Sequence, residues 1–255
     1  MSIQALSDLH IDYSENLKWL QGLSRLDYQQ DTLILGGDIS HEMKLIETAF
    51  YHLKKIFKEV IFVPGNHDLW IAGNRQLTSL QKFDQIRRMA AVYGVHTSTL
   101  YLDNVTIIPL LGWYDYSFGQ PTEIAIQSWQ DFYACNWAGF NSVAGITQHF
   151  LALNETNLAL HRPGIPTITF SHFLPRIDLM PDYIPADRRI IYPFLGSNGL
   201  EAQIRKVNPI IHIYGHSHVN VKRTIDDVFY INNAFGYPEE TRITAKQLLC
   251  VHDSN

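Results

Sequence analysis

The sequence predicts an α/β fold in which short buried strands alternate with amphipathic helices. Three observations carry this prediction: brief apolar runs rich in β-branched residues, helical patterns between these runs, and the Gly, Pro or Asp residues that bound them. Because the runs are almost continuously apolar, we expect most of the strands to be buried on both faces of their sheet.

Eight segments have the length and composition of strands. In chain order they are Ile3–Ser7, Thr32–Gly36, Val60–Val63, Val105–Leu111, Thr167–Ser171, Ile210–Tyr214, Val228–Ile231 and Gln247–Val251. Five segments are expected to be helices. They are Glu15–Leu26, Glu42–Lys58, Leu77–Tyr93, Ala144–His161 and Leu200–Val207. In the second helix, "EMKLIETAFYHLKKIF", apolar residues recur at intervals of three and four, which indicates one buried face.

Length and composition set the class of protein. The chain has 255 residues, of which 46% are hydrophobic, and this fits a single domain over residues 1–255. The net charge of −5 gives no basic field, so we expect no nucleic-acid partner. The first residues lack the charged and apolar regions of a signal peptide, so none is expected. No apolar run is long enough for a membrane span. With only two cysteines, Cys135 and Cys250, the expectation is a cytoplasmic protein without a disulfide framework.

The segment 112–142 differs from the rest of the chain. It is crowded with Trp, Tyr and Phe and lacks a clean period, so we expect an ordered insertion or a long loop. One interpretation is a satellite apolar cluster beneath a loop. The other is a rim that faces the substrate, in which case Trp113 and Asp115 border the pocket and bind substrate, because they follow the Val105–Leu111 strand.

Polar side chains follow five of the expected strands directly. In chain order these residues are Asp8, His10, Asp38, Asn66, His67, Asp68, His172, His216 and His218. In open α/β sheets, the carboxyl ends of the strands form the edge at which ligands bind. Oxygen and imidazole donors without thiolate suit Mn, Fe, Zn, Ni or Co. The donors are too many for one tetrahedral site and about right for two sites that share a carboxylate.

These motifs resemble those of a known family. The set D-x-H, G-G-D, G-N-H-D, a single His after a strand, and G-H-x-H, in this order, resembles the calcineurin-like metallophosphoesterases over Asp8 to His218. The resemblance implies a four-layer sandwich of the α+β type, with two β-sheets face to face, helices outside, and a dinuclear metal site. The implied ligands of the first metal ion are Asp8, His10, Asp38 and His218. Those of the second are Asp38, Asn66, His172 and His216, so that Asp38 bridges the two ions.

The resemblance also implies a role for the two residues after Asn66. His67 faces the substrate phosphate, as proton donor or as phosphate clamp, and Asp68 orients the His67 ring. Two metal ions, with Mn²⁺ expected first and iron, zinc, nickel or cobalt as alternatives, would hold an attacking hydroxide and clamp the phosphate oxygens. Asn66 and His67 are therefore expected to contact substrate.

The expected function is hydrolysis of a small phosphodiester or phosphomonoester. A Ser/Thr protein phosphatase is an alternative, although the extended arginine-bearing signatures of that group are not evident. A non-catalytic scaffold with the same fold is a second alternative, but Asp8, Asp38 and His67 all remain. A DNA exonuclease fits the motifs, whereas the acidic balance counts against it. The motifs leave the substrate, the native metal pair and the oligomeric state open.

Overall fold

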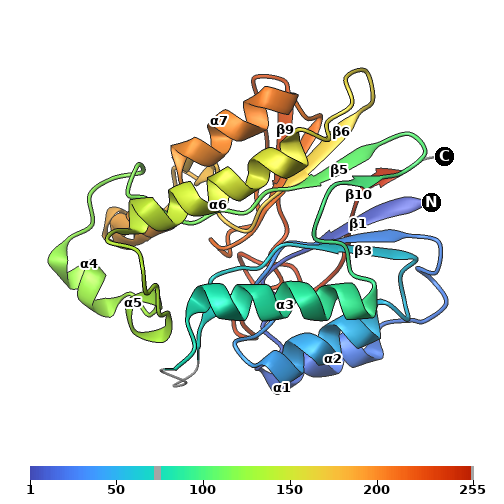
Figure 1. The fold of residues 1–255 in the computed structure, drawn as a ribbon, viewed down its shortest axis with the longest axis horizontal. Helices are drawn as coiled ribbons and strands as arrows, with labels where there is room; N and C mark the ends of the chain where they lie inside the picture. The colour runs from blue at the N-terminus through green and yellow to red at the C-terminus, as the bar shows by residue number, and fades with distance from the viewer. Residues whose placement is uncertain (72–75, 254–255) are drawn as a thin grey trace.

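The computed structural model describes residues 1–71 and 76–253 of the chain. Within these residues, ten strands form two sheets that pack face to face, and helices cover the outer face of each sheet (Figure 1). The order of the layers is therefore helix, sheet, sheet, helix. No helix among the described residues combines the length and the hydropathy that crossing a membrane requires.

The first sheet has four strands in the order β10-β1-β2-β3. Their bounds are β1 (Ser2–Leu6), β2 (Thr32–Leu35), β3 (Glu59–Phe62) and β10 (Leu249–Asp253). Strands β1, β2 and β3 run parallel, with Leu6 opposite Leu35 and Leu35 opposite Phe62. The three segments that follow these strands consequently leave the sheet at the same edge.

The second sheet has six strands in the order β4-β5-β6-β7-β9-β8. Their bounds are β4 (Leu100–Tyr101), β5 (Thr106–Pro109), β6 (Thr167–Phe170), β7 (Ile211–Tyr214), β8 (Lys222–Ile225) and β9 (Val228–Asn232). The four inner strands are parallel, and the two edge strands are antiparallel to their neighbours. The inner strands therefore also release their carboxyl ends at one common edge.

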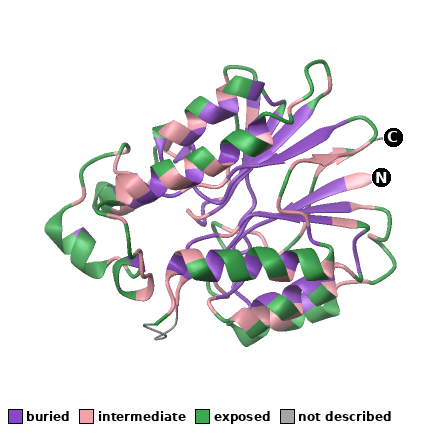
Figure 2. Ribbon diagram, viewed as in Figure 1, coloured by how far each residue is buried: buried purple, intermediate pink, exposed green. Residues whose placement is uncertain are grey.

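Helices pack on the outer faces of both sheets. Helices α1 (Ser14–Gly22), α2 (Met43–Leu53) and α3 (Ser79–Tyr93) lie on the side of the first sheet, and α6 (Val143–Leu158) and α7 (Asn198–Val207) on that of the second (Figure 1). Each helix is buried along one stripe only, whereas the inner strands are buried over nearly all of their length (Figure 2). The burial of the inner strands confirms the expectation that they are covered on both faces.

Alternation along the strands divides the core into layers. Ile34 and Ile61 point into the space between the sheets, where they meet Ile168 and Ile213 of the second sheet. Their neighbours along the first sheet, such as Leu35, belong instead to the cluster under helices α1–α3. Because successive side chains of a strand point to opposite faces, a strand between two apolar layers buries nearly all of its residues, and a polar one such as His212 is hydrogen-bonded to its neighbour Thr169.

The ends of several elements differ from the expected bounds. Helix α2 ends at Leu53, although the apolar periodicity predicts helix to Lys58; Ile56 and Phe57 are still buried after the regular helix has ended. The apolar periodicity therefore predicts which residues are buried, but not where the helical backbone hydrogen bonds end. Strands β4 and β8 were not expected, because β4 has two residues and β8 is a largely exposed edge strand of polar composition.

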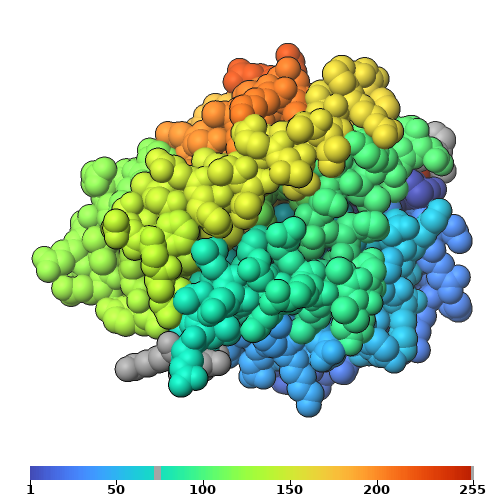
Figure 3. All heavy atoms as spheres, in the orientation of Figure 1, coloured from blue at the N-terminus to red at the C-terminus, as the bar shows by residue number. Residues whose placement is uncertain are grey.

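The aromatic segment 112–142 contains two short helices, α4 (Glu123–Ser128) and α5 (Asp131–Ala134). It forms one end of the molecule, on the left of Figure 3. Its first residues are core residues, whereas Ile124 and Tyr133 are 73% and 66% exposed. Three further single-turn or 3-10 segments are η1 (His67–Leu69), η2 (Ile177–Leu179) and η3 (Ala186–Phe194).

Candidate active site

A pocket of about 330 Å³ lies where the carboxyl ends of both sheets meet. Its lining includes Asp38 and His67 from the first sheet, His216 from the second, Trp129 from the insertion and Tyr237 from the segment after β9. Five separate loops of the chain therefore form one cavity.

The backbone turns sharply where the candidate ligands leave the strands. Five of them have a positive φ, which non-glycine residues rarely adopt. These are Asp8 (54°), His10 (43°), Asp38 (54°), His216 (67°) and His218 (52°). Left-handed backbone in non-glycine residues is strained and concentrates at functional sites. Here it directs the five side chains toward the same edge.

Two glycines allow the carboxylates to sit close to the backbone. A Cβ atom on Gly65 would lie 2.1 Å from Oδ1 of Asp38, and one on Gly215 would lie 2.5 Å from Oδ2 of Asp8. No side chain fits at such distances. The glycines of the G-N-H-D and G-H-x-H motifs are thus required by the approach of a carboxylate.

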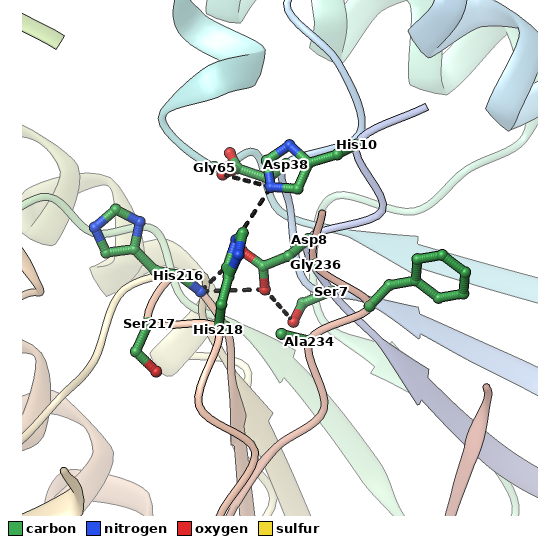
Figure 4. Close-up of polar contacts among 12 residues, drawn as sticks. Ser7, Asp8, His10, Asp38, Gly65, His216, Ser217, His218, Ala234 and Gly236 are labelled. Atoms are coloured by element: carbon green, nitrogen blue, oxygen red, sulfur yellow. Dashed lines mark hydrogen bonds and ion pairs between the residues drawn. The ribbon is translucent and has the colours of Figure 1, made fainter. Parts of the chain in front are cut away.

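Asp8, His10 and His218 form the first cluster of donor atoms. Nε2 of His218 lies 3.1 Å from Nε2 of His10 and 3.2 Å from Oδ1 of Asp8. Figure 4 shows His10, from the end of β1, directed at His218, with Asp8 beside them. The Ser7 hydroxyl donates to Oδ2 of Asp8 at 2.6 Å, and the His216 backbone N–H also donates to this carboxylate. The first cluster thus joins the two sheets.

Asp38, His172 and His216 form the second cluster, which Asn66 adjoins. Nδ1 of His172 lies 2.9 Å from the carbonyl oxygen of Gly36, and Nε2 of His216 lies 3.1 Å from that of Phe194. A carbonyl only accepts, so these ring nitrogens carry the protons. In the neutral rings the other nitrogens, Nε2 of His172 and Nδ1 of His216, then hold lone pairs, and they lie 3.2 Å apart.

This arrangement fits a cation. Oδ1 of Asn66 lies 3.1 Å from Nε2 of His172, so that a third acceptor faces the two ring lone pairs. Oδ2 of Asp38 lies 3.4 Å from the same nitrogen and 3.8 Å from Nε2 of His10, and it therefore reaches both clusters. Acceptors that face one another repel unless a positive ion lies between them. The donor set matches that of borderline or hard metal ions.

Burial controls the protonation of the histidines. It holds the pKa of His10 and His216 well below the usual value, helped by neighbouring imidazoles, and it also lowers the pKa of His172. These rings are thus neutral, which is the form that binds metal ions. His218 differs: burial opposes its charge, but Asp8 and Glu240 raise its pKa to about 9.

The pKa values of the two candidate carboxylate ligands, Asp38 and Asp8, shift in opposite directions. Burial and the nearby Asp68 and Asp8 raise the pKa of Asp38 well above its usual value. Burial alone would also raise the pKa of Asp8, but the adjacent His218 lowers it. A site that concentrates carboxylates and neutral imidazoles at this depth favours positive charge between them.

Asp68 does not orient His67, contrary to the expectation from the sequence. Its carboxylate accepts hydrogen bonds from four backbone N–H groups, and the structure shows none between it and the His67 ring among the described residues. The donors are Gly65 (2.8 Å), Asp38 (2.8 Å), Ile39 (2.9 Å) and Ser40 (3.1 Å). The reason is local: the η1 turn directs Asp68 inward, where it is 0% exposed. Asp68 therefore joins the loops after β2 and β3.

The ring of His67 is positioned by an aromatic neighbour. It stacks on the indole of Trp70, with centroids 3.7 Å apart and planes at 25°. It also meets the ring of His10 edge-on, at 4.7 Å. Its Nε2 lies 3.9 Å from Oδ2 of Asp38, at the border of the pocket. Burial lowers the pKa of His67 well below its usual value.

Trp113 and Asp115 do not border the pocket, so the expectation of a rim at these positions is corrected. Trp113 is 0% exposed and packs against Trp137 and Phe173. Asp115 accepts a hydrogen bond from the Ser117 backbone N–H and is not part of the pocket lining. The chain after β5 passes beneath α6, whose Asn154 and Thr147 side chains donate to the carbonyls of Leu111 and Tyr114.

Several pocket residues were not identified from the sequence. Trp70 is the second residue after G-N-H-D, and Trp129 and Asp131 lie in the aromatic segment, so the sequence marked their neighbourhood but not the residues. Tyr237, whose ring lies 4.6 Å from that of His10, and Glu240, whose Oε2 is 2.6 Å from Nδ1 of His218, follow β9 without any motif.

Comparisons with known proteins give a consistent result. The family model described as calcineurin-like phosphoesterase matches residues 1–220. The acyl-carrier-protein phosphodiesterase PptH of Mycobacterium tuberculosis is 25% identical over 94% of this chain and 79% of its own length. The uncharacterized protein L509 of Acanthamoeba polyphaga mimivirus is 23% identical, over 93% of this chain and 92% of its own.

Solved structures share the fold. The crystal structure of phosphopantetheinyl hydrolase (PptH) from Mycobacterium tuberculosis superposes with a TM-score of 0.82 at 23% identity, covering 98% of this chain and 95% of its own. That of TT1561 of Thermus thermophilus has a TM-score of 0.50 at 12% identity, over 91% of this chain and 88% of its own. The resemblance seen in the motifs and the four-layer fold are confirmed. The chain belongs to the calcineurin-like phosphoesterase family and is a hydrolase that acts on phosphate esters.

Proposed function

We propose that this enzyme hydrolyses a phosphodiester with the help of two metal ions, both of which we expect to be Mn²⁺. The proposed ligands of the first ion are Asp8, His10, Asp38 and His218, and those of the second are Asp38, Asn66, His172 and His216. The proposal is supported by the acceptor atoms that face one another in the second cluster, by the imidazole and carboxylate groups gathered in the first, and by Asp38, which reaches both. When bound, the ions would supply Lewis acidity and an activated water at neutral pH.

One observation favours a diester over a monoester. Among the described residues that line the pocket, none is a lysine or arginine, whereas Glu240 and Asp131 contribute carboxylates. A monoester carries close to two negative charges near neutral pH, whereas a diester carries one. The smaller charge suits a pocket whose positive charge would come from the ions alone. The same observation counts against a Ser/Thr protein phosphatase.

We assign His67 as a hydrogen-bond donor to the phosphate rather than as a general acid. A general acid must hold its proton near neutral pH, for which a hydrogen-bonded carboxylate partner is the usual device. Among the described residues, no carboxylate lies within hydrogen-bond distance of the His67 ring; that of Asp38 is 3.9 Å away. Stacked on Trp70, the neutral ring can still present one N–H to substrate.

The pocket also suggests the class of ester. Trp70, Trp129 and Tyr237 give it an aromatic wall beside the candidate metal ligands. Such side chains combine apolar area with a polar edge and suit an organic arm of the diester. Since the relative PptH is named an acyl-carrier-protein phosphodiesterase, we propose a carrier protein with its phosphopantetheine arm as the substrate to test first.

The test compares turnover of bis-p-nitrophenyl phosphate and p-nitrophenyl phosphate by Mn²⁺-loaded protein, with Asp38→Ala as the blank. We expect the diester to be preferred, and phosphopantetheine to be released from acyl carrier protein, as seen by mass spectrometry of the intact carrier. Preference for the monoester would overturn the diesterase proposal. Activity on the diester without release from the carrier would retain the reaction and reject that substrate.

A further inference from the structure

Asp131 is a buried carboxylate at the site that none of the motifs includes. It begins helix α5 of the insertion and is 2% exposed. Its Oδ1 accepts hydrogen bonds from Nδ2 of Asn66 at 2.9 Å and from Nε1 of Trp70 at 2.6 Å. Its Oδ2 accepts one from Nε1 of Trp129 at 2.9 Å. One side chain thus connects the insertion to the loop after β3.

The contact with Asn66 determines which end of that amide faces the second cluster. An asparagine amide has an oxygen that accepts and an NH₂ group that only donates, and the two ends have almost the same shape. Because Asp131 takes the NH₂ group, Oδ1 points the opposite way and lies 3.1 Å from Nε2 of His172. Only the oxygen can bind a metal ion, so the orientation decides whether Asn66 is a ligand.

The position requires a side chain that only accepts. The hydrogen bonds from Asn66, Trp70 and Trp129 to Asp131 all come from N–H groups, two of them indoles that have no acceptor of their own. An asparagine at this position would bring an NH₂ group that has to face one of these donors. Charge-assisted hydrogen bonds of this kind are also the stronger ones. A carboxylate therefore holds the three partners in one arrangement.

The other two partners extend the effect across the pocket. Trp70 stacks on the His67 ring. Trp129 stacks on Phe194, with centroids 4.7 Å apart and planes at 12°, and the Phe194 carbonyl is the partner of Nε2 of His216. Through Trp70, Asp131 is linked to the His67 ring. Through Trp129, it is linked to Phe194, whose carbonyl holds His216 of the second cluster.

We propose that Asp131 is a positioning residue: it turns the Asn66 oxygen toward the second metal ion and so couples the aromatic insertion to metal binding. The inference rests on the proposed function only in placing that ion among Asp38, Asn66, His172 and His216. It assigns the insertion a role in assembling the site, in addition to lining it.

The first experiment measures Mn²⁺ binding to the metal-free protein by calorimetry, with the ions resolved as a stronger and a weaker site. We expect Asp131→Asn to weaken one of the two sites 10- to 100-fold and the other by less than threefold, since substitutions behind a ligand have effects of this size. Glu123→Gln, an exposed carboxylate of the same insertion, is the matched control and should bind as the wild type does. Two sites of wild-type affinity in Asp131→Asn would overturn the proposal.

A double-mutant cycle tests whether Asp131 acts through Asn66. If it does, Asp131→Asn should have little further effect on Mn²⁺ binding once Asn66→Ala is present, because coupled residues are not additive. Additive losses would mean that Asp131 acts elsewhere, and would reject the inference.

An exchanged pair keeps the inference testable if Asp131→Asn does not fold. In Asn66→Asp/Trp70→Phe/Asp131→Asn, the new amide can donate to the new carboxylate, and the indole N–H that shares Oδ1 of Asp131 with Asn66 is removed, so we expect two Mn²⁺ ions to bind. Binding of one ion by this folded variant would overturn the proposal. All these measurements are made without substrate: absent diester turnover with the expected affinities would reject the proposed function alone.

Discussion

At the scale of single residues, several buried groups hold the loops of the site in place. Lys82 of α3 is 2% exposed, and its amine donates to the backbone carbonyls of His41 and Trp70. It therefore links the loop after β2 to the loop that carries His67. Burial lowers the pKa of Lys82 to about 8, below its ordinary value of 10.5.

Lys82 should make stability depend on pH in a defined window. Between pH 8 and 10.5 the unfolded chain keeps the Lys82 proton that the folded protein has lost, so the free energy of unfolding from this group rises with pH. We expect the stability of the wild type relative to Lys82→Met to increase from pH 7.5 to pH 10, as measured by urea unfolding. A difference that stays constant over this range would contradict the prediction.

At the scale of elements, the insertion 112–142 is divided between the core and the pocket. Its beginning packs in the core beneath α6, as an apolar cluster under a loop would. Its middle, residues 128–131, lines the pocket. The interpretation as a substrate-facing rim was therefore wrong for Trp113 and Asp115 and stays a prediction for residues 128–131, because aromatic composition alone does not say which aromatic residue is covered.

Trp113→Ala should act on stability rather than on substrate. Deleting a fully buried Trp leaves a cavity, and we expect a loss of about 3–5 kcal/mol in the free energy of unfolding. Tyr133→Ala, in the same insertion but 66% exposed, should change it by less than about 0.5 kcal/mol. Urea unfolding of both variants checks this. Unchanged stability of Trp113→Ala together with a raised KM would restore the prediction of a substrate rim.

At the scale of the whole molecule, the candidate metal ligands come from both sheets. Asp8, His10, Asp38 and Asn66 follow strands of the first sheet, whereas His172, His216 and His218 follow strands of the second. The proposed ions would therefore hold the two halves of the sandwich together at one edge. The aliphatic layer between the sheets does the same over the rest of the interface.

Removing metal should for this reason lower the stability of the entire fold. At a metal concentration 100 times the dissociation constant, binding stabilises the folded state by about 2.7 kcal/mol, and a chelator abolishes this term. We expect EDTA to lower the Tm of Mn²⁺-loaded wild type and to leave that of Asp38→Ala nearly unchanged, because the variant lacks the shared ligand. An equal effect of EDTA on both proteins would count against Asp38 as the bridge.

The sequence by itself determined the fold class and the set of candidate metal ligands that gather at the site. It could do so because each of these residues directly follows an apolar strand, from Asp8 after β1 to His218 after β7. Parallel strands bring their carboxyl ends to one edge, so local sequence predicts a shared location without any knowledge of the packing.

Only the tertiary structure decided how these residues are held. Asp131 meets Asn66 across 65 residues of sequence, and Glu240 meets His218 across 22. Asp68 lies next to His67 in the chain, yet its carboxylate is directed at backbone N–H groups of the loop after β2 and at that of Gly65. Neighbourhood in sequence places a side chain at an edge of a sheet. Its partners there depend on which loops the packing of two sheets brings within hydrogen-bond distance.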